Sequence, residues 1–64
     1  MTLITLLKEE LETERKLIIY CGYIVIARGK ANELYNYMNG GLYCKSVTKY
    51  ENLVIVEIDM EERK

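Results

Sequence analysis

The sequence predicts an α+β fold in a single domain over residues 1–64, with a small antiparallel sheet of about four strands and two helices in the order α-β-β-α-β-β. Two observations predict this fold. Segments with apolar residues every three or four positions alternate with segments rich in β-branched and aromatic residues. In addition, a chain of 64 residues is near the lower size limit for one hydrophobic core.

The first expected element is an amphipathic helix over residues 2–14. Leu3, Ile4, Leu7 and Leu11 recur at helical spacing and form its apolar stripe. Thr2 is a candidate N-cap, because a threonine hydroxyl can accept a hydrogen bond from a free amide of the first turn.

Four glutamates of this helix could be imagined as metal ligands. Hard cations need several oxygen ligands in a shaped pocket, so we expect a solvated helix exterior instead, with no metal and no cofactor. The four residues are Glu9, Glu10, Glu12 and Glu14.

A β-hairpin is expected over residues 17–28, with Cys21 and Gly22 at its turn. That turn would place Tyr20 opposite Tyr23 on the neighbouring strand. The second strand is apolar on both faces and is therefore expected to be buried on both faces.

A short helix over residues 31–38 follows, and residues 39–41 end it because asparagine and glycine tolerate left-handed backbone. We expect Leu34 and Met38 to dock on the sheet. Two strands complete the chain, at residues 42–50 and 53–58. The expected core face is Val47, Val54, Val56 and Ile58, and the opposite face is Ser46, Thr48, Ile55 and Glu57.

The predicted sheet has more apolar surface than one short helix covers. Either the N-terminal helix shields the second face, or two chains pair through it. The small size of the chain favours a homodimer.

The chain contains no histidine, so a Ser-His-Asp or Cys-His relay cannot form. Cys21 and Cys44 are isolated thiols without a Cys-x-x-Cys pair. We expect Cys44 to be a small buried hydrophobe and Cys21 to lack an activating partner. The interpretation is that the protein is not an enzyme.

Two short segments give weak signals of other functions. The apolar start of the chain has no preceding basic residue and is followed by Lys8 and two glutamates, so we expect neither a signal peptide nor a membrane span, and a cytoplasmic location with reduced thiols. Residues 29–32, with Gly29 and Lys30, lie at a strand-to-helix junction that could bind an anion. They lack the other residues of a phosphate loop and are more typical of a simple turn.

Charge is unevenly distributed although the formal net charge is only −1. Residues 15–49 carry six basic groups and one acidic group, whereas both ends are acidic. The basic middle could steer an acidic partner or simply attract the ends of its own chain.

Tyrosines alternate with basic residues along the middle of the chain and are typical of binding surfaces. They could anchor a protein partner, or stack on bases in a small nucleic-acid or nucleotide binder; the net charge argues against the latter. A third alternative is a regulator that assembles through its N-terminal helix, in which loss of residues 1–12 would spare the sheet. The expected contact residues are Arg28, Tyr37, Tyr43, Lys49 and Tyr50.

The stretch over residues 20–38 resembles small accessory proteins of phages that infect low-GC Gram-positive bacteria. In it, an Ala27-Arg28-Gly29 step leads into a helix with a Glu33-Leu34 pair. In length and small-domain character the chain is similar to the Hachiman anti-defence inhibitors, and the likeness covers residues 18–58. The resemblance implies a non-enzymatic protein in the host bacterial cytoplasm that binds and blocks a bacterial defence protein. It assigns no binding residue.

Overall fold

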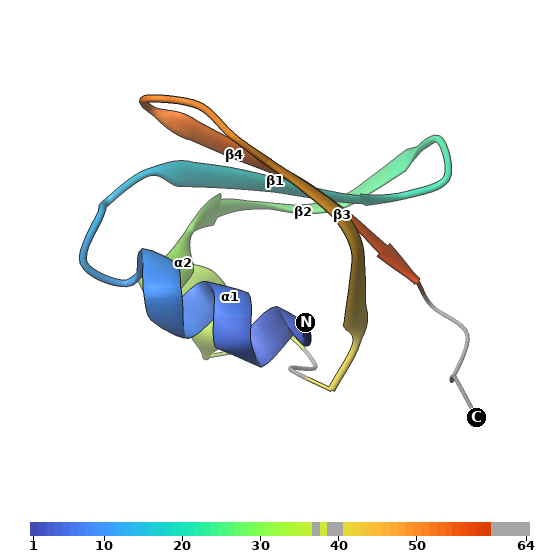
Figure 1. Ribbon diagram of the computed structural model, residues 1–64, viewed down its shortest axis with the longest axis horizontal. Helices are drawn as coiled ribbons and strands as arrows, with labels where there is room; N and C mark the ends of the chain where they lie inside the picture. Colours follow the sequence, from blue (N-terminus) through green and yellow to red (C-terminus); the bar gives the residue numbers. More distant parts are fainter. Residues whose placement is uncertain (37, 39–40, 60–64) are drawn as a thin grey trace.

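The α+β order expected from the sequence is confirmed by a computed structural model, which describes residues 1–36, 38 and 41–59 (Figure 1). The elements are α1 (Leu3–Glu10), β1 (Lys16–Cys21), β2 (Ile24–Lys30), α2 (Ala31–Tyr35), β3 (Tyr43–Lys49) and β4 (Leu53–Asp59).

The four strands form one sheet in the order β2-β1-β4-β3. The β1–β2 and β3–β4 pairs are antiparallel, but β1 and β4 are parallel, so the expectation of a purely antiparallel sheet is wrong. The cause is the connection through α2, which carries the chain across the sheet so that β3 runs in the direction of β2. Because β4 reverses from β3, it lies parallel to β1.

Both helices lie on the same face of the sheet, below it in Figure 1. The core is the layer between them, where burying each large apolar side chain contributes about 1.5–3 kcal/mol. Its members are Leu3, Leu6, Leu7, Leu17, Ile19, Ala31, Leu34, Val54, Val56 and Ile58.

Helix α1 is shorter than expected. It ends at Glu10, and Glu14 has a positive φ of 58°, which turns the chain toward β1. Leu6 is buried in the core, whereas Leu11, expected in the apolar stripe, is 40% exposed. Thr2 occupies the expected N-cap position, but its hydroxyl is within hydrogen-bond distance of the Thr5 hydroxyl and makes no capping bond.

The β1–β2 hairpin turns one residue later than expected. Gly22 and Tyr23 form the turn, and Gly22 has a φ of 62°, a conformation that glycine adopts without strain. Tyr20 therefore pairs with Val25, not with Tyr23, and the register shifts between Ile19 and Tyr20, which makes a β-bulge in β2.

The expectation that the second strand is buried on both faces is also wrong. Strand β2 is an edge strand, and its first three residues are exposed. Two helices on one face cannot cover the other face of an edge strand.

The C-terminal hairpin follows the expected pattern. Val47 pairs with Val56 on the core side, and Thr48 pairs with Ile55 on the other side. Helix α2 is shorter than expected and ends at Tyr35; residues 39 and 40 of the expected helix stop lie outside the described residues. Leu34 is buried and Met38 packs against the core, as expected.

Candidate interaction surface

The sheet has a second face that neither helix touches, which we call the outer face. Side chains alternate along each strand, so residues next to core positions point away from the helices. By this alternation and the strand register, the outer face includes Lys16, Ile18, Tyr20, Val25, Arg28, Tyr43, Ser46, Thr48, Leu53, Ile55 and Glu57.

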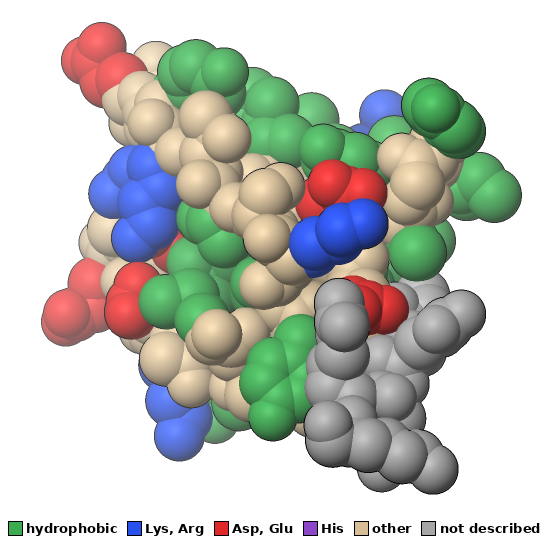
Figure 2. All heavy atoms as spheres, turned by 45° about the vertical axis from the view of Figure 1, so that its right-hand side comes forward, with side chains coloured by type: hydrophobic (Ala, Val, Ile, Leu, Met, Phe, Trp, Pro, Cys, Tyr) green, Lys and Arg blue, Asp and Glu red, His purple; other side chains and the backbone are tan. Residues whose placement is uncertain are grey.

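Apolar and aromatic side chains occupy the middle of the outer face. Ile18 and Ile55 are direct neighbours on the parallel pair β1–β4, and both are only partly buried. In Figure 2 the sheet remains uppermost, and hydrophobic side chains form a continuous band along that upper side. Among the described residues, the N-terminal helix does not shield this face, because it packs on the opposite one.

Charges on the outer face are separated along the strands. Lys16 begins β1 and pairs with the end of β2, whereas Glu57 lies toward the end of β4, beside Tyr20. The outer face thus combines an apolar centre, flanked by Arg28 opposite Ile18, with a basic end at Lys16 and an acidic residue, Glu57, toward the other end.

The structure separates the five expected contact residues. Arg28 and Tyr43 lie on the outer face, but on opposite edge strands. Tyr50 is 53% exposed in the turn between β3 and β4, and its carbonyl accepts a hydrogen bond from Arg15 Nη1 at 3.1 Å. Tyr37 lies outside the described residues.

Lys49, the fifth expected contact, lies on the helix side of the sheet. Its Nζ is 3.3 Å from Glu9 Oε1 and 3.3 Å from Glu10 Oε2, so it joins β3 to α1. These ion pairs give Lys49 a role in holding the fold together, and we do not include it in the candidate surface.

Glu10 corrects the expectation that the α1 glutamates form a solvated exterior, because its side chain is only 1% exposed. Thr13 Oγ1 donates to Glu10 Oε1 at 2.7 Å, and Arg15 Nε is 3.2 Å from the same oxygen. Burial by itself raises the pKa of Glu10, but the hydrogen bonds from Thr13 and Lys49 and the nearby charges outweigh it, so the net pKa is lowered. Hydrogen bonds to the carboxylates of Glu10 and Glu9 raise the pKa of Lys49.

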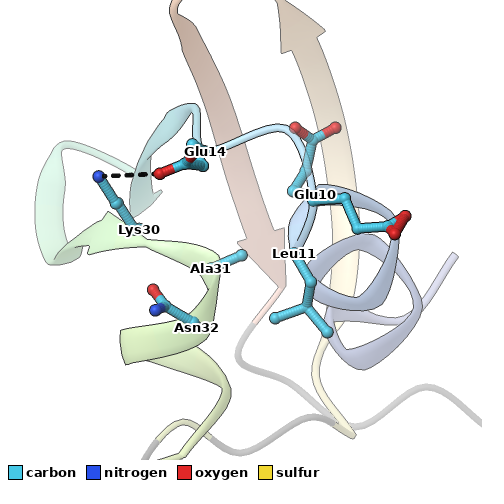
Figure 3. Close-up of a pocket in the computed structure, with 7 residues that line it drawn as sticks. Glu10, Leu11, Glu14, Lys30, Ala31 and Asn32 are labelled. Carbon is cyan, nitrogen blue, oxygen red and sulfur yellow. Dashed lines mark ion pairs between the residues drawn. The ribbon is translucent and has the colours of Figure 1, made fainter.

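A cleft of about 400 Å³ lies between the end of α1 and the start of α2 (Figure 3). Lys30 Nζ and Glu14 Oε1 are 3.6 Å apart across it. The backbone amide of Lys30, which the sequence suggested as an anion donor, instead donates to Glu33 Oε1 at 3.0 Å. The junction therefore satisfies its own amide, as a turn does. The cleft is lined by Glu10, Leu11, Glu12, Glu14, Lys30, Ala31 and Asn32.

Both cysteines are free thiols and partly buried. Cys44 packs against the core as expected, and burial raises the pKa of its thiol, which disfavours the reactive thiolate. Within the described part of the chain, no three metal-ligating side chains come together.

Sequence reasoning missed two outer-face residues of the central strands β1 and β4, Ile18 and Leu53. Consecutive apolar residues in β1 gave no alternation that could separate the two faces. The sequence signal that could have identified the outer face was the pair of amphipathic helices. Both helices bury their apolar stripes against the same face of one sheet, which leaves the other face uncovered by helices.

Comparison of the chain with protein-family models, curated proteins and solved structures finds no match. No helix among the described residues has the length and apolar character needed to cross a membrane.

Proposed function

We propose that the protein is a non-enzymatic, cytoplasmic interaction module that binds and blocks a bacterial defence protein through the outer face of its sheet. The observation that carries the proposal is that both helices cover one face of the sheet. The other face presents apolar and aromatic side chains.

The composition of the outer face supports a protein partner. Ile18, Ile55 and Tyr20 offer an apolar centre, and tyrosine covers a large area at a low cost in side-chain entropy. Arg28 and Tyr43 extend this centre toward the two edges of the sheet. The resemblance of residues 18–58 to phage anti-defence proteins supplies the class of partner.

A plaque assay tests the function. Cells that carry a Hachiman-type defence system are infected with a sensitive phage, with and without expression of this chain. We expect the chain to restore plaques, and the double variant Arg28→Ala/Tyr43→Ala to restore at least about tenfold fewer, since loss of two anchors costs more than about 1.4 kcal/mol of binding.

The control is Lys8→Ala, an exposed change on α1 away from the outer face, which should restore plaques fully. Direct binding of the purified defence protein to both variants separates loss of binding from loss of expression. Failure of the wild-type chain both to restore plaques and to bind the defence protein contradicts the proposal.

A second candidate function is binding of single-stranded nucleic acid, because Lys16, Tyr20 and Arg28 share the outer face. A tyrosine between basic residues on an open sheet can stack a base while the cations contact phosphates. Glu57, directly beside Tyr20, weakens this function by repelling phosphate.

Titration with fluorescent single-stranded DNA and RNA tests it. Nucleic-acid binding predicts an affinity that falls steeply with added salt, because phosphate contacts release counterions. No binding, or binding that salt does not change, removes this candidate.

A further inference from the structure

The two edges of the sheet differ in how well they are protected. An edge strand offers unpaired N–H and C=O groups to any other strand, and proteins usually protect such edges with lysines or with covering segments. In this chain β3 has both forms of protection, whereas the first half of β2 has neither among the described residues.

At the β3 edge, the start of the chain covers the backbone. The Cys44 amide donates to the Met1 carbonyl at 2.9 Å, and the Leu3 amide donates to the Leu42 carbonyl at 2.7 Å. Polar and basic side chains follow along the same strand: Lys45, Ser46, Thr48 and Lys49.

At the β2 edge, four consecutive apolar or aromatic side chains are exposed. Tyr23 is fully exposed, and Ile24, Val25 and Ile26 are exposed by 69%, 55% and 40%. In the described residues β2 pairs with β1 alone. Together these side chains expose an area on the order of 500 Å², near the largest patch that monomers leave uncovered.

We propose that residues 23–27, which are the turn residue Tyr23 and the first half of β2, pair in antiparallel fashion with the same residues of a second copy of this chain. Two such patches together expose about 1,000 Å², which is the upper limit of what this contact buries and the lower limit for a specific interface; the shared backbone hydrogen bonds add to it. This inference goes beyond the proposed function, because it requires no second protein.

The charges of β2 select the antiparallel arrangement. A two-fold axis at Val25 places Tyr23 of each copy opposite Ala27 of the other, next to Arg28, where the guanidinium can contact the ring. A parallel pair would instead place Arg28 beside Arg28, and like charges directly opposite are destabilising.

The pairing stops at two copies. Over the residues that the structure describes, each chain has one unprotected edge, so a β2–β2 pair leaves only the protected β3 edges at the two ends of the combined sheet. The cations Arg28 and Lys30, which follow these residues, confine the pairing to the beginning of the strand. The expected product is a closed dimer with an eight-stranded sheet.

The test is the mass in solution by light scattering, at concentrations up to about 1 mM. The wild-type chain should have twice the mass of one 7.5 kDa chain. Ile24→Lys places a cation at the edge, and should weaken dimerisation at least about tenfold. The matched control is Thr48→Lys, which adds the same charge to the exposed outer face on β3 and should leave the dimer unchanged.

Several results would overturn the proposal. The first is a wild-type chain that is monomeric, and the second is an Ile24→Lys variant that dimerises as strongly as wild type. The third is a Thr48→Lys variant that dissociates, because this result would place the contact on the outer face. If Ile24→Lys does not fold, amide hydrogen exchange of the wild-type chain decides. Exchange of residues 23–27 should slow as concentration rises, and slowing confined to other residues contradicts the proposal.

Discussion

Glu10 shows how a single residue can stabilise the helix layer of this small domain. Its carboxylate is almost fully buried, yet it accepts a hydrogen bond from Thr13 and forms ion pairs with Arg15 and Lys49. A buried charge is tolerated only when it is paired and hydrogen-bonded. The cluster therefore ties the end of α1 both to the loop before β1 and to β3.

Replacement of Glu10 by glutamine should destabilise the fold by about 2 kcal/mol. The amide can still accept the Thr13 hydrogen bond, but Arg15 and Lys49 lose their buried anion; because both cations are partly exposed, the cost is below that of breaking a fully buried pair. Urea unfolding at neutral pH measures it. Glu9→Gln is the control: it removes the exposed partner of Lys49 and should cost less than about 0.5 kcal/mol, so equal costs would contradict a special role for Glu10.

The lowered pKa of Glu10 predicts how stability depends on pH. The unfolded chain takes up this proton near the ordinary value of 4.5, whereas the folded chain takes it up only at lower pH. The contribution of Glu10 is therefore complete above the ordinary value and is lost as pH falls through the lowered one. Urea unfolding at a series of acidic pH values should show that the difference in the free energy of unfolding between wild type and Glu10→Gln shrinks as pH falls. A difference that stays constant with pH would contradict this prediction.

At the scale of elements, the junction between β2 and α2 depends on a backbone conformation that only glycine adopts readily. Gly29 has a φ of 147°, and a Cβ atom there would lie 3.1 Å from Glu33 Oε1. That carboxylate is held in place by the Lys30 amide, so the strand passes directly into the helix.

Gly29→Ala should therefore cost about 1–3 kcal/mol, because it adds both backbone strain and a close contact. Gly22→Ala is a matched comparison: Gly22 also has a positive φ, but no described residue beyond its two chain neighbours comes within 4 Å of the added methyl group, so about 1 kcal/mol is expected. Thermal or urea unfolding of the two variants gives the comparison. A Gly29→Ala variant as stable as wild type would show that the junction can relax.

The sequence predicted which elements form better than it predicted their surroundings. Val54, Val56 and Ile58 alternate cleanly, and their burial is confirmed. By contrast, Ile24 and Val25 were expected to be buried but are exposed. This expectation failed because residue type does not reveal whether a strand is central or at an edge of the sheet. The hairpin register failed for a local reason, since a turn shifted by one residue and a bulge change every pair.

For the whole molecule, strand direction could not be derived from the sequence. The chain encodes two hairpins, but only the crossing of α2 beneath the sheet brings β1 and β4 together as a parallel pair. This arrangement concentrates both helices on one face and creates the outer face. The candidate surface is therefore a product of topology, and contacts expected from composition alone, such as Lys49, fell on the wrong side.

Deletion of residues 1–12 tests how the whole fold depends on α1. A regulator that assembles through this helix would keep its sheet after the deletion. The structure instead places Leu3, Leu6 and Leu7 in the core, with no exposed area. Losing one buried leucine typically costs about 2–5 kcal/mol, while the core of so small a domain supplies only about 3–5 kcal/mol in total. We therefore expect the truncated chain to be unfolded.

Circular dichroism and the dispersion of amide proton signals report the outcome of this deletion. Leu11→Ala is the control, because Leu11 follows the same helix but is 40% exposed, and this variant should remain folded. A truncated chain that keeps a folded sheet would mean that β1 to β4 and α2 form a sufficient core alone. Helix α1 would then be available for assembly with another chain. The face of the sheet that α1 covers would become a second candidate surface for a partner, beside the outer face.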